Sequence, residues 1–241
     1  MSIARRPFLA GLGVAAATTA LNTIPSNATE QSSPAEGAEG LKAIALPAPE
    51  IRGGKPVMEA FAVRSTSREF AGGELPIQTL SNLLWTAFGI NRPGAGMRTA
   101  PSAMNWQETD IYVIMSSGAY VYDAAGNSLK PVASGDLRAL TGVQPYVKNA
   151  PVSLVYVADA KKMTMSEDIP KPMKDVVEAL KEPMKWADSA VIAENVYIFA
   201  ASEGLATGVR ALIDRAALAK ALRLGSDQSI MLAQCVGLPK R

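Results

Sequence analysis

The feature of the sequence that most restricts its fold is the irregular order of its helical and strand-like segments. Apolar periodicity predicts a helix from Pro56 through Phe61 and another after Pro76, and a hairpin with its turn at residues 123–127. The other expected elements are strands at 110–115, 151–158 and 228–236, a connector at 161–185, and helices at 188–203 and 214–222. Because helices and strands do not alternate regularly, the order favours an α+β fold with a mixed sheet flanked by helices over a doubly wound parallel sheet.

The first 28 residues have the composition of an export signal. The run RRPFL at residues 5–9 resembles the twin-arginine signal, and an apolar stretch through Leu21 leads to a small-residue cleavage site ending at Ala28. The apolar stretch is too short for a stable membrane span, so we expect an exported, periplasmic protein. Residues 29–54 are rich in Ser, Pro, Glu, Gly and Ala and predict a flexible linker. One domain is expected at 55–241.

Composition removes several classes of protein from consideration. The chain has no histidine, which excludes Ser-His-Asp and Cys-His hydrolases and His-ligated metal sites, and we expect no metal. Its single cysteine, Cys235, stands among apolar residues and is expected in the core. Arg5 and Arg6 account for the whole net charge of +2, so the rest of the chain offers no electrostatic footprint for nucleic acid. Difficult chemistry would then need an organic cofactor.

The segment from Arg64 to Phe70, Arg-Ser-Thr-Ser-Arg-Glu-Phe, combines two guanidinium groups with three hydroxyls. Forked, permanently charged donors and nearby hydroxyls match the oxygens of a phosphate group. For this segment on its own, a solvated loop after a helix is the commoner explanation.

Two further segments complete a candidate flavin site. In 100–107, the Asn105 amide can donate and accept, as the edge of a flavin pyrimidine ring requires. In 203–212, Gly204 is placed to end a helix, and the extended stretch after it could direct backbone N–H groups at the flavin N5 and O4. Taken singly, an ordinary loop and an ordinary helix exit explain these segments too.

Together, the three segments resemble the FMN-dependent nitroreductase superfamily. The order Arg-x-[Ser/Thr]-x-Arg-x-Phe, Pro-Ser-x-x-Asn-x-Gln, and a long helix ending in Gly-Leu-x-Thr carries the resemblance over about residues 55–241. The motifs at 89–92, 98–103, 136–138 and 188–190 are similar to the SagB/ThcOx-type dehydrogenase branch. The resemblance implies a mostly antiparallel sheet and FMN bound at a homodimer interface. An export signal does not fit the cytoplasmic azoline-oxidising members of that branch.

The resemblance also implies roles for individual residues around the phosphate. Arg64 and Thr66 would hold the phosphate, with Ser65 in the same loop, and Arg68 would reach the ribityl chain or a pyrimidine carbonyl. Lys240 and Arg241 at the end of the chain match the basic phosphate ligands that relatives carry after the last strand.

Around the ring, the resemblance implies that Pro101, Ser102 and Asn105 pack against it and hydrogen-bond to it. The backbone expected to cover the other side near N5 belongs to Val209, Arg210, Ala211 and Leu212. No catalytic side chain is implied, and NAD(P)H is a candidate transient donor. The resulting hypothesis is a flavin-dependent oxidoreductase acting on a small molecule. A flavin-binding protein of the same fold without turnover, and a cofactor-free interaction domain, are the alternatives.

Overall fold

The computed structural model describes residues 38–240 of the chain. The expected signal peptide and Arg241 lie outside the described residues. The helices are α1 (Val57–Val63), α2 (Ile77–Phe88), α3 (Lys171–Glu203) and α4 (Arg215–Ala221). The strands are β1 (Ile44–Ala45), β2 (Ile90–Arg92), β3 (Met97–Arg98), β4 (Thr109–Met115), β5 (Gly118–Asp123), β6 (Ser128–Ser134), β7 (Val152–Asp159), β8 (Ala206–Arg210) and β9 (Gln228–Gly237).

Seven of these strands form one sheet in the order β1-β6-β5-β4-β7-β9-β8, while β2 and β3 pair separately. Every pairing within the described sheet is antiparallel. The predicted hairpin is confirmed as β5 and β6, whose turn is held by Asp123 Oδ1, which accepts from the Ala125 and Gly126 amides. The fold is therefore α+β with a sheet flanked by helices, as the sequence predicts.

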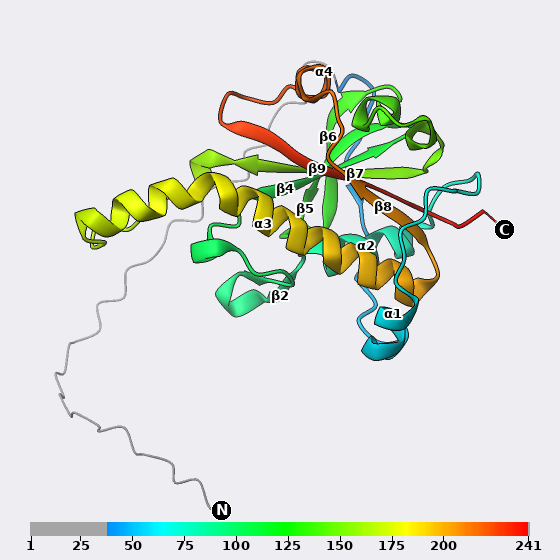
Figure 1. The fold of residues 1–241 in the computed structure, drawn as a ribbon. Coiled ribbons are helices and arrows are strands. Elements are labelled where there is room, and N and C mark those ends of the chain that lie inside the picture. The colour runs from blue at the N-terminus through cyan, green and yellow to red at the C-terminus, as the bar shows by residue number, and fades with distance from the viewer. Residues whose placement is uncertain (1–37, 241) are drawn as a thin grey trace, which may run out of the picture. The chain divides into compact units, whose positions relative to one another are not determined.

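Helices cover both faces of the sheet (Figure 1): α1, α2 and α3 lie on one side, and α4 lies on the other. Alternation along β4 divides its side chains between the two layers, because successive residues of a strand point to opposite faces. Ile111 and Val113 join the core beneath α2 and α3, whereas Tyr112 and Ile114 join the core beneath α4. Burying each such aliphatic side chain contributes about 1.5–3 kcal/mol.

Helix α3 is much longer than the sequence predicts, since it begins at Lys171 rather than at Asp188. The expected connector is mostly its N-terminal half, which projects beyond the sheet in Figure 1 and contains Pro183. That half has few core contacts and exposes Met173 and Val176, so its pattern lacks the apolar face by which helices are recognised. In the described part of the chain, no helix is long and apolar enough to cross a membrane.

The folded domain also begins earlier than predicted. Residues 44 and 45 form strand β1 and pair with Leu129 and Ser128 of β6, within the range expected to be a flexible linker. The Asn127 side chain then donates to the carbonyl oxygens of Leu46 and Pro47. Such contacts are made by the main chain and need no apolar sequence pattern. The start of the folded domain was therefore predicted at Lys55, later than the structure shows.

Candidate functional site

The candidate phosphate segment lies against the edge strand β8 and the end of the chain. The Ser67 amide donates to the Thr207 carbonyl oxygen at 2.9 Å, and the Lys240 amide donates to the Glu69 carbonyl oxygen at 3.3 Å. The structure thus brings together the first predicted segment, the third predicted segment and the basic C-terminal residue, although they are far apart in sequence.

Tyr197 of α3 joins these pieces through its hydroxyl. The hydroxyl accepts a hydrogen bond from the Val209 amide at 2.9 Å and is 3.0 Å from Thr66 Oγ1. The Arg64 guanidinium lies over the ring of Tyr197, 5.3 Å from its centroid. Sequence reasoning missed Tyr197, because a tyrosine in the run Val-Tyr-Ile-Phe is indistinguishable from an ordinary core residue.

Gly208 permits the close approach between β8 and this segment. A Cβ at Gly208 would lie 3.2 Å from the Ser67 carbonyl oxygen and 3.4 Å from Thr66 Cγ2. A larger side chain would separate the strand from the loop, so glycine keeps the backbone of β8 beside Thr66 and Ser67.

Arg64, Ser65, Thr66, Arg68 and Lys240, together called the phosphate cluster below, have the chemistry expected of a phosphate site. Arg64 is half-buried, Arg68 and Lys240 are exposed, and within residues 38–240 none of the three forms a salt bridge. A cavity of about 490 Å³ adjoins Lys240 and is also lined by Ala71, Gly204, Leu238 and Pro239. Three cations without an acidic partner, next to two exposed hydroxyls, leave their donors available for an anion.

Arg210 behaves differently from the other arginines, since its side chain points into the core and is only 6% exposed. Its guanidinium donates to the Thr141 carbonyl oxygen at 2.8 Å, to Thr141 Oγ1 at 2.6 Å and to Cys235 Sγ at 3.0 Å. Its backbone pairs with Ala233 of β9, whereas Ala211 and Leu212 after it are exposed. Cys235 is fully buried, which confirms its expected core position.

The Val209 amide is not available in the way the sequence suggests. Its N–H is already bonded to the Tyr197 hydroxyl, so it cannot also be directed at a flavin in this conformation. The backbone donors that remain near the end of β8 belong to the exposed residues Ala211 and Leu212.

The second predicted segment, the 101–107 loop, has a tightly specified shape. Met104, Asn105 and Gln107 have φ values of 49°, 55° and 50°, in the left-handed region that costs a non-glycine residue about 1–2 kcal/mol. Hydrogen bonds offset this cost: the Gln107 amide donates to Ser102 Oγ at 2.8 Å, and the Gln107 side chain donates to Asn105 Oδ1 at 3.0 Å. Pro101 and Asn105 are exposed on the outer side of the loop.

Beneath the loop lie two buried acidic residues: Glu108, which sequence reasoning missed, and Asp188, which it named only as part of the 188–190 motif. Glu108 is fully buried and accepts from Ser102 Oγ at 3.1 Å, and Asp188 of α3 accepts from the Ala103 amide at 2.8 Å. Burial raises the pKa of the Glu108 carboxyl, and the nearby charge of Asp188 raises it further. An acidic residue on an otherwise apolar helical face was the available signal for Asp188.

The loop and the phosphate cluster occupy different places along α3. Asp188, under the loop, and Tyr197, in the cluster, are separated by nine residues of helix, which corresponds to about 14 Å of rise. The structure therefore unites Arg64, Thr66 and Lys240 with the backbone of β8 but leaves Pro101, Ser102 and Asn105 in a separate group.

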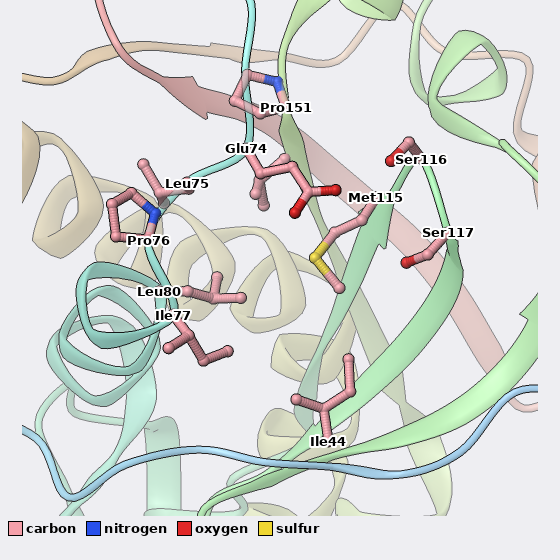
Figure 2. Close-up of a pocket in the computed structure, with 11 residues that line it drawn as sticks. Ile44, Glu74, Leu75, Pro76, Ile77, Leu80, Met115, Ser116, Ser117 and Pro151 are labelled. Atoms are coloured by element: carbon pink, nitrogen blue, oxygen red, sulfur yellow. The ribbon is translucent and has the colours of Figure 1, made fainter.

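Another cavity, of about 350 Å³, opens beside the start of α2 (Figure 2). Its walls are mainly apolar, including Leu75, Leu80 and Met115, and Glu74 is the only charged residue among the described residues that line it. Because no cation lines it, this cavity is unsuited to a phosphate group. In the described residues no cluster of acidic or cysteine side chains could hold a metal ion.

The Nitroreductase family model matches residues 62–238. A protein from Ralstonia eutropha JMP134 described as a nitroreductase is 36% identical, with a TM-score of 0.74 over 83% of this chain and 90% of its own.

Two more distant structures share the fold. One from Anabaena variabilis, also described as a nitroreductase, is 15% identical with a TM-score of 0.65 over 84% of this chain and 42% of its own. The E. coli microcin synthetase complex contains a chain that is 18% identical, with a TM-score of 0.60 over 89% of this chain and 85% of its own. No curated protein matches the chain. The extent of the family match, the 36% identical relative and the shared fold establish that this chain belongs to the nitroreductase family.

Proposed function

We propose that the protein is an FMN-dependent oxidoreductase that moves hydride or electrons between a donor and a small-molecule acceptor. The observation that carries this proposal is that the segment holding Arg64 and Arg68 is hydrogen-bonded through its backbone both to β8 and to Lys240. Within residues 38–240 none of these three cationic residues forms a salt bridge. Membership of the nitroreductase family supports a flavin as the group held there.

Each residue of the cluster has a distinct role in the proposal. Arg64, with Ser65 and Thr66, binds the phosphate, and Lys240 adds a further positive charge, as would Arg241. Arg68 reaches the ribityl chain or a pyrimidine carbonyl. Tyr197 positions Thr66 and fixes the end of β8, so that the phosphate ligands and the ring-facing backbone keep a constant distance.

The proposal includes a homodimer, in which Pro101, Ser102 and Asn105 reach the flavin held by the other subunit. The separation of the two groups along α3 supports this arrangement, since one chain does not bring them together. Exposed apolar side chains also support it: Met58 of α1 is 75% exposed and Met173 of the projecting half of α3 is 54% exposed. Such side chains are typical of surfaces that another chain covers.

When bound, FMN would supply the redox chemistry through its N5 position, with NAD(P)H as a candidate transient donor. The protein's part is to bind and orient the group. The proposal assigns the stabilisation of developing negative charge to the backbone N–H groups of Ala211 and Leu212, which are exposed. Because the flavin would supply the redox chemistry and the protein would only bind and orient it, no histidine is required, in agreement with the composition.

The proposal extends to the location and branch of the protein. The arginine pair at residues 5–6 and the apolar stretch after it support twin-arginine export to the periplasm after folding around the cofactor. The motifs at 89–92, 98–103 and 188–190 support the SagB/ThcOx-type branch. Secretion of a reporter fused to residues 1–28, with and without an Arg5→Lys/Arg6→Lys change, tests the export signal.

The binding site is tested by the Arg64→Ala/Arg68→Ala double variant. We expect it to purify folded but without flavin, because the permanently charged phosphate donors are gone. The matched control is Arg52→Ala/Arg223→Ala, which removes two exposed arginines outside the cluster and should retain flavin. Equal flavin content in both variants would contradict the phosphate assignment.

Turnover is tested separately from binding. The flavin-loaded protein is mixed anaerobically with NAD(P)H, or reduced with dithionite, and then exposed to nitroaromatic and quinone acceptors. Bleaching followed by reoxidation that depends on the acceptor supports an oxidoreductase. A flavin that stays reduced with every acceptor supports the alternative of a binding protein without turnover.

A further inference from the structure

Two buried carboxyl groups hold the 101–107 loop from beneath. Asp188 accepts from the Ala103 amide at 2.8 Å, and Glu108 accepts from the Ser102 hydroxyl at 3.1 Å. The two buried carboxyl groups thus bind adjacent residues of the loop, so they lie near each other. Two ionised carboxylates held together away from water repel each other, which favours a proton on one of the two.

No nearby cation compensates a second negative charge at this position. Within residues 38–240, neither Glu108 nor Asp188 forms a salt bridge. The charged groups on the surrounding elements have other partners: Asp110 of β4 pairs with Lys162, Lys185 of α3 pairs with Glu182, and Arg98 of β3 donates to the side-chain oxygen of Gln107. A fully ionised pair would therefore place two like charges together in a buried site.

The loop above the pair depends on these contacts for its shape. Met104, Asn105 and Gln107 adopt left-handed backbone conformations, which persist only where the surroundings hold them in place. The carboxyl groups bind the loop at Ser102 and Ala103, immediately before these three residues. A disturbance of the pair is thus transmitted directly to the residues whose side chains the flavin would contact.

We propose that Glu108 and Asp188 share one proton and act as positioning residues, holding the 101–107 loop in its flavin-binding shape so that flavin affinity falls when the proton is lost. This inference rests on the proposed function, since it takes Ser102 and Asn105 as flavin ligands. The pair thereby makes flavin retention dependent on pH through a group that does not touch the flavin.

The direction of the pH dependence follows from the chemistry of Glu108. Burial raises the pKa of Glu108, and the Asp188 charge raises it further, so the folded protein favours the protonated form. The stabilisation is complete below the ordinary pKa of glutamate and is lost as the pH rises through the raised value. Flavin binding should therefore weaken as the pH rises above the raised pKa of Glu108.

The test compares the wild type with Glu108→Gln, whose amide is permanently neutral and can donate to Asp188 as a protonated Glu108 does. FMN dissociation constants are measured by fluorescence titration from about pH 5 to about pH 9. The flavin's own titration cancels in the ratio of wild type to variant. We expect that ratio to rise about tenfold across the range, as the competent state of the wild type is depopulated. Asp110→Asn, two residues away, is the matched control and should follow the wild type.

A second measurement does not depend on flavin. Trp106 lies within the loop, and its indole N–H donates to the Thr164 carbonyl oxygen at 2.6 Å. In a Trp85→Phe/Trp186→Phe background without flavin, Trp106 emission should change with pH in the presence of Glu108 and remain constant with Glu108→Gln.

The two measurements separate the possible failures. Parallel pH profiles of the wild type and Glu108→Gln, in FMN affinity or in Trp106 emission, would overturn the shared proton. Failure of both proteins to bind FMN at about pH 5 would overturn the proposed function, and the Trp106 measurement would then decide about the pair alone.

Discussion

Replacing Tyr197 with phenylalanine isolates the contact that joins the phosphate segment to β8. The change removes one hydroxyl and leaves the ring, so the Arg64 guanidinium can still lie over it. What disappears is the acceptor for the Val209 amide at 2.9 Å and the partner of Thr66 Oγ1 at 3.0 Å.

The expected cost can be worked out from these two contacts. Thr66 is exposed and can bond to water instead, so its loss contributes little. The Val209 amide lies between β8 and α3, and a buried donor left without a partner costs about 1–3 kcal/mol. Since Val209 is only half-buried, we expect the free energy of unfolding to fall by about 1–2 kcal/mol.

The assay is urea unfolding of the flavin-free protein followed by circular dichroism. The matched control is Tyr146→Phe: the Tyr146 ring packs 6.4 Å from that of Phe70, and no described residue hydrogen-bonds its hydroxyl. Its midpoint should match the wild type, whereas that of Tyr197→Phe should be lower by about 0.5 M. If the two variants unfold at the same urea concentration, the bridging role of Tyr197 is refuted.

Three further changes probe other parts of the structure. Gly142→Ala would put a Cβ 2.5 Å from Nε of the buried Arg210 side chain, and this overpacking should cost about 1–3 kcal/mol in urea unfolding. Asp214→Ala removes the carboxylate that caps α4 and should cost about 1 kcal/mol by the same measurement. The hydrogen bond from Arg138 lowers the pKa of Asp136, so the stability from this pair is present above the ordinary aspartate pKa and lost as the pH falls through the lowered value. The stability difference between the wild type and Arg138→Met, measured in urea from neutral to strongly acidic pH, should therefore shrink on acidification; a constant difference would contradict the assignment.

The parts of the fold that sequence predicts well are those with strong local signals. Helix α2 begins after Pro76 and ends before Gly89, as predicted, because proline and glycine mark its ends and its apolar residues share one face. The N-terminal half of α3 was missed because its exposed positions include apolar residues and Pro183 interrupts the pattern. Strand β1 was missed because a strand of two residues is too short to show an alternating apolar pattern in the sequence.

In the candidate site, too, residues with a local sequence signal were found and residues that act through long-range contacts were missed. Local chemistry pointed to the segment from Arg64 to Phe70 as a match for a phosphate, but the roles of Arg64, Thr66 and Lys240 came from the family resemblance. Tyr197 and Glu108 act through contacts between segments distant in sequence, which only the folded chain reveals. The separation of Ser102 and Asn105 from the phosphate cluster is likewise a property of α3 as a whole.

The central claim, that the cluster beside β8 holds FMN, is tested most directly by the visible absorption spectrum of the purified protein. The spectrum is recorded before and after denaturation, with the released flavin identified by mass. The account predicts FMN in an amount roughly equimolar to the chain, lost in Arg64→Ala/Arg68→Ala. A colourless protein that takes up no FMN when it is added would contradict the account, while leaving its place in the nitroreductase family unchanged.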